Sequence, residues 1–287
     1  MVQYRKIMMG GALALQLLSA GVFAAEIKVA KVSANLSAPD LGSKVWKGVA
    51  EEPISLMAQP IALPRPSTTT TSMIRVQAIH DGKWIAFRMK WKAASKNEAG
   101  RLGQFSDAVA LQFPVKAGSP PPIFMGEKGN PVHIFHWRAQ YQRDLEKGKP
   151  TMKQLYPNMN PDMYPMEFKD SGSVEGLTDA KREVYAPGQA SGNPQSYVKG
   201  SAVDEILAEG FGSSAVIENR MSIGKGEWSN GEWSVVIARP LVRESGSVLE
   251  PGKLGHVAFA VWQGGQQEVG ARKCVTMTWV PVQWVAQ

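Results

Sequence analysis

The chain has 287 residues, a formal net charge of +7 at pH 7 and a single cysteine, Cys274. Its basic residues are scattered, without the stripe or reader motif of a nucleic-acid-binding protein, so we expect no nucleic-acid partner. A single cysteine excludes an intramolecular disulfide, an iron–sulfur cluster held by this chain alone and the C-x-x-C-H attachment of a c-type haem. Any redox cofactor of this chain must therefore be held without cysteines.

The first 24 residues have the order of a secretory signal peptide. Arg5 and Lys6 precede an apolar run at residues 7–18, and small residues stand just before a polar segment. Two polar residues and two glycines break the run short of the roughly 18 apolar residues that a membrane span requires. We expect cleavage near Ala24, export to the periplasm and one soluble mature domain at residues 25–287. No later segment is long and apolar enough to span a bilayer.

The regular segments of the mature chain are short and typical of β-strands. Residues 72–79 and 83–91 alternate partly between apolar and polar side chains, and they flank Asp81-Gly82, a two-residue signal for a hairpin turn. Further strands are expected at residues 107–113, 132–137, 231–239, 256–262 and 273–280, the last of which Pro281 should end. Seven short strands separated by turn signals predict an all-β fold, an antiparallel β-sandwich.

A long excursion from about residue 140 to residue 200 breaks this pattern. It is rich in Pro, Gly, Asn, Met and charged residues, with no sustained period of two or of 3.6. Loops of this length are uncommon in compact domains unless they serve binding or assembly, so it either covers a site or partner or is a mobile surface insertion. Residues 203–209, entered by Ser201 and ended by Gly210, are predicted to form a short helix.

The sequence offers little for catalysis. It has no G-x-S-x-G, no H-E-x-x-H and no P-loop, so we do not expect an enzyme by itself. His133 and His136 are three apart on a predicted strand and should face opposite sides, which argues against a shared metal ion. Met125 follows three prolines and precedes Gly126, which fix the backbone. It is either a methionine that fills a gap in the core or a ligand that faces a pocket.

A series of motifs runs through most of the mature chain in a characteristic order. They lie at residues 103–114, 124–126, 136–139, 156–165, 190–194, 208–212, 228–240 and 259–273. Together, their order and spacing resemble the haem-b-binding gamma subunits of periplasmic molybdoenzymes of the ethylbenzene dehydrogenase and dimethylsulfide dehydrogenase type.

The resemblance implies a non-catalytic electron-transfer subunit. Its partners would be a molybdopterin-containing alpha subunit, an iron–sulfur beta subunit and a soluble cytochrome or similar redox carrier. It also implies one non-covalent b-type haem with Met125 and Lys273 as axial ligands. A lysine amine binds iron only when neutral, so burial must lower its pKa from about 10.4. His136 and Trp137 stand where a wall of the haem pocket is expected, with a plain packed strand as the alternative.

Two other functions fit the predicted fold. A carbohydrate-binding module is the main alternative, because similar sandwiches hold sugars and the nine tryptophans could stack on them. Against it, Trp84, Trp91, Trp233 and Trp262 lie in strand-like segments where core packing explains them. A structural subunit that has lost its haem would keep the fold and the partners without binding iron.

Overall fold

The regular structure of the described residues is mostly β-sheet, as the sequence predicts. The predicted signal peptide at residues 1–24 lies outside the described residues. Further parts of the 140–200 excursion also lie outside them. The computed structural model describes residues 25–38, 42, 44–98, 101–158, 186–191, 200–217, 220–242, 246–247 and 249–285.

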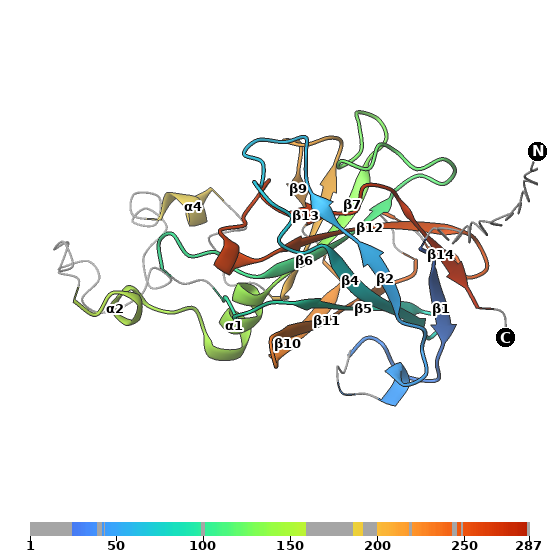
Figure 1. The fold of residues 1–287 in the computed structure, drawn as a ribbon, viewed down its shortest axis with the longest axis horizontal. Helices are drawn as coiled ribbons and strands as arrows, with labels where there is room; N and C mark the ends of the chain where they lie inside the picture. Colours follow the sequence, from blue (N-terminus) through green and yellow to red (C-terminus); the bar gives the residue numbers. More distant parts are fainter. Residues whose placement is uncertain are drawn as a thin grey trace, which may run out of the picture.

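The described residues contain fourteen hydrogen-bonded strands, eleven of them in one continuous path, and these strands form two facing layers (Figure 1). In the first layer the order is β10-β11-β5-β4-β1-β14, with β2 paired to β4; in the second it is β12-β6-β7-β8-β9, with β13 on β12 and β3 on β13. The strands are β1 (Ile27–Lys31), β2 (Glu52–Ser55), β3 (Met57–Ala58), β4 (Met73–His80), β5 (Trp84–Lys92), β6 (Ala108–Pro114), β7 (Val132–Arg138), β8 (Val203–Ala208), β9 (Ala215–Val216), β10 (Ile223–Ser229), β11 (Glu232–Pro240), β12 (Gly255–Trp262), β13 (Cys274–Val275) and β14 (Val280–Trp284).

Strand β12 belongs to both layers. Its first three residues pair with β14, and the residues from Ala258 onward pair with β6. Most neighbouring strands are antiparallel, including the β4–β5 hairpin that turns at Asp81-Gly82. The exception is β1, which is parallel to both of its neighbours, β4 and β14. The sandwich is therefore antiparallel except at β1, where the pairing is parallel.

The helical segments are short, and α1, α2 and α4 lie at the opposite end of the molecule from β1 and β14 (Figure 1). Within the described ranges, no helix has the length and apolarity that crossing a membrane requires. The segments are η1 (Lys44–Trp46), α1 (Ala139–Lys147), α2 (Met152–Leu155), α4 (Pro187–Ala190) and η3 (Gly264–Gln266).

The predicted helix at residues 203–209 is wrong, because this segment is β8. It pairs antiparallel with β7, and its fully buried Val203, Asp204 and Glu205 point in turn to opposite faces of the sheet. A short segment has little helical stability of its own, so pairing along a whole neighbouring strand decides its conformation.

Two further predictions need correction. The strand expected at residues 273–280 is two strands, β13 and β14, and Pro281 lies inside β14 instead of ending it. Pairing of β14 with β1 begins only at Val282, so the N–H that Pro281 lacks is not needed there. The beginning of the expected irregular excursion forms α1, whose buried side chains are only Ala139 and Tyr141. So short an apolar face leaves almost no periodic signal in the sequence.

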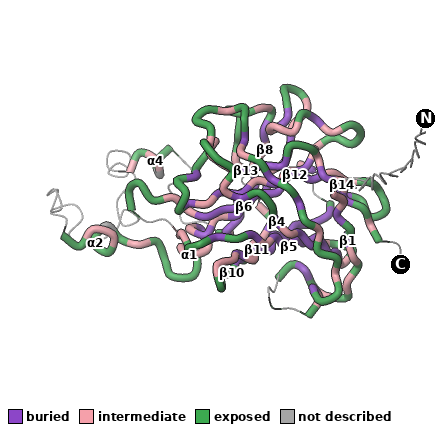
Figure 2. The backbone as a smooth tube through the Cα atoms, in the orientation of Figure 1, coloured by how far each residue is buried: buried purple, intermediate pink, exposed green. Residues whose placement is uncertain are grey.

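Aromatic side chains from both layers meet in one core, and the buried residues concentrate along the strands (Figure 2). Trp137 of β7 packs edge-on against Trp233 of β11, with ring centres 5.2 Å apart. The Trp137 ring also occupies the space above Gly226 of β10, where a Cβ atom would come within 2.4 Å of it. A residue larger than glycine at this position would push the two layers apart.

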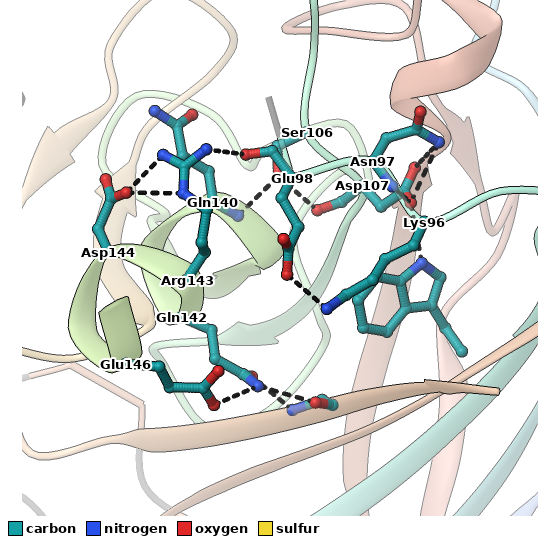
Figure 3. Close-up of polar contacts among 12 residues, drawn as sticks. Lys96, Asn97, Glu98, Ser106, Asp107, Gln140, Gln142, Arg143, Asp144 and Glu146 are labelled. Carbon is teal, nitrogen blue, oxygen red and sulfur yellow. Dashed lines mark hydrogen bonds and ion pairs between the residues drawn. The ribbon is translucent and has the colours of Figure 1, made fainter. Parts of the chain in front are cut away.

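Asp107, immediately before β6, is the polar centre of this core. It is fully buried, and burial raises the pKa of its carboxyl group. The carboxylate accepts hydrogen bonds from Trp233 Nε1 at 2.9 Å and from the backbone N–H groups of Asn97 and Gly264 at 2.8 Å each. Figure 3 shows how these contacts adjoin α1, where Gln140 N donates to Ser106 Oγ. The Asp107 side chain thus connects the two layers, and the neighbouring Ser106 hydroxyl connects the start of β6 to the first turn of α1.

We expect Asp107→Ala to lower the free energy of unfolding by about 3–5 kcal/mol, because it leaves three buried donors without an acceptor. Urea-induced unfolding of the variant and the unmodified chain measures the difference. Glu250→Gln is the control, since Glu250 forms an exposed ion pair with Lys253 and should change stability by less than about 1 kcal/mol. Equal stability of Asp107→Ala and the unmodified chain would contradict this role.

Candidate functional site

The outer face of the second layer has a floor of small side chains. Alternate residues of β6 enter the core, whereas Ala108 and Ala110 face outward together with Ile134 of β7 and Ala260 of β12. Ala260 pairs with Ala110, which pairs in turn with His136 of β7. The buried methyl groups of Ala108 and Ala110 lie in the centre of this cluster, and the larger Ile134 and Trp262 side chains border them.

Lys273 lies at one edge of this floor, directly before β13. The pairing of Cys274 with Val261 brings Lys273 opposite Trp262, and the Lys273 ammonium lies 4.9 Å from the centre of the Trp262 ring. The side chain is only partly exposed, and loss of hydration lowers its pKa to about 8. No charged side chain of the described residues contributes to that shift. Lys273 therefore releases its proton more readily than an ordinary surface lysine.

His136 stacks on the other side of this group. Its ring lies 4.5 Å from the Trp262 ring at an angle of 26°, and 9% of its surface is exposed. Burial, followed by the positive charges of Arg138 and Lys273, holds the pKa of His136 well below its usual range, so the imidazole is neutral at neutral pH. His136 Nε2 is buried and has no hydrogen-bond partner among the described residues. A buried nitrogen without a partner is a sign of a missing acceptor or donor.

Residues 120–126, which include Met125, are fixed over the outer face at the Gln112 end of β6. Met125 has a φ of +68°, a conformation that residues other than glycine rarely adopt and that persists only where the surroundings enforce it. Three hydrogen bonds of 2.7 Å from separate parts of the chain hold this segment: Gln112 Nε2 to the Ile123 carbonyl, Trp279 Nε1 to the Pro121 carbonyl and Gly210 N–H to the Met125 carbonyl. The turn is therefore preformed.

The two ends of the face are connected through β6. Ala108 pairs with Trp262, and Gln112 lies four residues further along the strand, which corresponds to about 13 Å. The structure thus brings Lys273, His136 and the Met125 segment to one face. Trp137 is fully buried on the opposite face of β7, where its Nε1 donates to Gln142 at 3.1 Å. It does not join the other three predicted site residues.

His133 and His136 lie on opposite faces of β7, as their spacing of three residues predicts. His133 lies on the inner face of β7, fully buried with its Nε2 3.4 Å from Glu205, whereas His136 lies on the outer face. No group of three or more His, Cys, Asp or Glu side chains in the described ranges is arranged to hold a metal ion. Cys274 is buried beside Thr70 and Thr71.

Sequence reasoning missed the floor and its aromatic edge. The signal was present, because alanines recur with period two at residues 108 and 110 of β6 and at residues 258 and 260 of β12. Small residues at alternate positions of two strands mark a face that another group approaches closely. Trp262 was assigned to core packing, yet it separates His136 from Lys273 on the outer face.

The family model described as ethylbenzene dehydrogenase matches residues 43–274, which is most of the chain. The chain belongs to the ethylbenzene dehydrogenase family. A protein of Haloferax mediterranei provisionally named a respiratory nitrate reductase heme subunit is 26% identical over 88% of this chain and 70% of its own length. The chlorate reductase subunit gamma of Ideonella dechloratans is 24% identical over 82% of this chain and 75% of its own length.

The fold of this family member also has distant counterparts among solved structures. One is a family 9 carbohydrate-binding module from Caldicellulosiruptor kristjanssonii in complex with glucose, which is 8% identical and has a TM-score of 0.43. The match covers 91% of this chain and 96% of the module.

The burial of Lys273 predicts a pH dependence of stability in the ligand-free protein. Its pKa is about 8 in the folded state and 10.5 ordinarily, so between these values the unfolded chain binds more protons. Stability relative to Lys273→Met should therefore rise with pH across this window and stay constant below pH 8. Urea unfolding at half-unit intervals of pH from 7 to 10.5 measures the difference in stability, with Lys28→Met, at an exposed position of β1, as the surface control. A constant difference over the whole range would contradict the assignment.

Proposed function

We propose that this chain holds one non-covalent b-type haem on the outer face of β6, β7 and β12, with Met125 and Lys273 as its axial ligands. The observation that carries the proposal is a desolvated lysine amine on the same face as a preformed methionine turn. It is supported by the family and by relatives named as heme or gamma subunits. The chain is then an electron-transfer subunit of a molybdopterin oxidoreductase and not its catalyst.

The residues on this face fit such a group chemically. The Lys273 amine offers a nitrogen lone pair once its proton is lost, and its lowered pKa reduces the cost of that step. A methionine thioether favours reduced iron and so raises the reduction potential. The alanine floor and the Trp262 ring would exclude water from an apolar group held there. When bound, the haem supplies a one-electron carrier, and two protein ligands leave no iron position for a substrate.

The same proposal specifies the setting of the chain. We place it in the periplasm after cleavage near Ala24, beside an iron–sulfur beta subunit and a molybdopterin alpha subunit. Electrons would pass between the iron–sulfur subunit and an external carrier such as cytochrome c. The signal peptide pattern and the relatives' names support this arrangement.

The tryptophans give little support to a carbohydrate-binding function. All nine lie among the described residues, and each is buried or only partly exposed. Stacking on a sugar requires an aromatic ring whose face is open to the ligand. Trp91, Trp137 and Trp233 instead pack against one another in the core.

Substitution of each ligand tests the proposal. Protein purified after expression with haem should show a b-type spectrum, with all haem removed by acid extraction. Met125→Ala and Lys273→Ala should each lose haem occupancy or the six-coordinate low-spin spectrum, because one axial donor is missing. Met73→Ala, at an exposed position on β4, is the matched control and should retain both. Full occupancy with an unchanged spectrum in both ligand variants would refute the assignment.

A further inference from the structure

A second charged side chain faces the same floor at the far end from Lys273. Arg138, the last residue of β7, pairs with Ala108, which pairs with Trp262. Because Lys273 lies opposite Trp262, Arg138 and Lys273 stand at the two ends of one row across four strands. Adjacent strands are about 4.8 Å apart, so the two backbones are separated by roughly 14 Å.

The contact between Arg138 and His136 defines which histidine nitrogen carries a proton. Arg138 Nη2 lies 3.5 Å from His136 Nδ1, and a guanidinium group can only donate hydrogen bonds. His136 Nδ1 is therefore the acceptor, and in the neutral ring the proton resides on Nε2. That Nε2–H is the buried group without a partner in the described part of the chain. What it lacks is an acceptor.

The surroundings of this donor are positively charged. The Arg138 guanidinium lies 4.9 Å from the centre of the Tyr141 ring, and no described carboxylate forms an ion pair with it. Asp204 of β8 pairs with His136 in the sheet, but its carboxylate binds Arg220 at 2.9 Å. Two donors and an uncompensated positive charge meet at one end of an apolar floor, which is the environment that an anionic oxygen requires.

We infer that Arg138 and His136 form a carboxylate site that binds a propionate group of the haem and so sets its orientation on the floor. This inference rests on the proposed haem function. A carboxylate attached to a flat apolar ring could bind Arg138 and His136 while the ring contacts the alanine floor beside them. A free anion would contact only Arg138 and His136. His136 and Arg138 are positioning residues here, since neither is assigned to the iron.

Binding of two porphyrins tests the inference. Haem b and haem dimethyl ester, whose carboxylates are blocked, are titrated into the full chain and into Arg138→Met and His136→Phe. The second variant keeps an aromatic ring to stack on Trp262 but removes the donor. We expect Arg138→Met to weaken haem b binding ten- to a hundredfold, because a hydrogen bond to a charged group is lost. His136→Phe should weaken it less, and both should bind the dimethyl ester within about twofold of the unmodified chain.

The outcomes separate this inference from the function on which it rests. If the variants bind haem b and its dimethyl ester with equally weakened affinity, Arg138 and His136 only maintain the fold. If the variants bind haem b with unchanged affinity, the positive charge of Arg138 serves something else, such as an acidic partner. Either result overturns the carboxylate site and leaves the haem proposal intact. An unmodified chain that binds neither porphyrin refutes both. Arg75→Met, on β4 in the other layer, is the control for loss of a strand arginine.

Discussion

The pairing register of β6, β7 and β12 determines which side chains of these three strands enter the core and which face outward. Side chains alternate between the two faces of a strand. In the observed register, Trp137 and the aliphatic residues of β6 point into the core, whereas His136 and the alanines point outward. A shift by one residue would exchange the two sets. The large buried area of the inner residues therefore fixes the outer face as well.

Buried polar side chains hold the two layers in this relation. Asp107 connects the start of β6 to Trp233 in the facing layer, and Arg239 of β11 reaches across the core to Ser247, with its guanidinium 4.9 Å from the centre of the Phe135 ring. Each such group is costly to bury and is satisfied only in the correct arrangement of layers. These contacts favour one packing over others of similar hydrophobic area.

Much of the architecture is readable from sequence because it depends on local patterns. Strands β4, β5, β6, β7, β11 and β12 follow alternation and turn signals closely, as does the turn at Asp81-Gly82. Strand β8 was misread because its conformation comes from pairing with β7, and α1 because only two of its residues are buried. Residues 192–199 and 159–185 of the excursion lie outside the described part of the chain, so its function stays a prediction.

The candidate site was predictable in its parts but not in its arrangement. Resemblance to a family supplied Met125 and Lys273, and the period of two placed His136 opposite His133. Nothing local places Trp262 between His136 and Lys273, since that contact depends on the β12–β13 pairing. For the same reason, only the fold shows that Trp137 points away from its neighbour His136.

The three hydrogen bonds that hold the Met125 turn have a consequence for the order of events during folding. Trp279 is 158 residues away from Pro121 in sequence, and Gly210 follows the whole excursion. Contacts across such separations form late, because closing long loops costs chain entropy. The methionine turn therefore assembles only after the last strands have paired. If the proposed haem binds at this turn, it would therefore meet a nearly finished protein, and its insertion would complete folding instead of nucleating it.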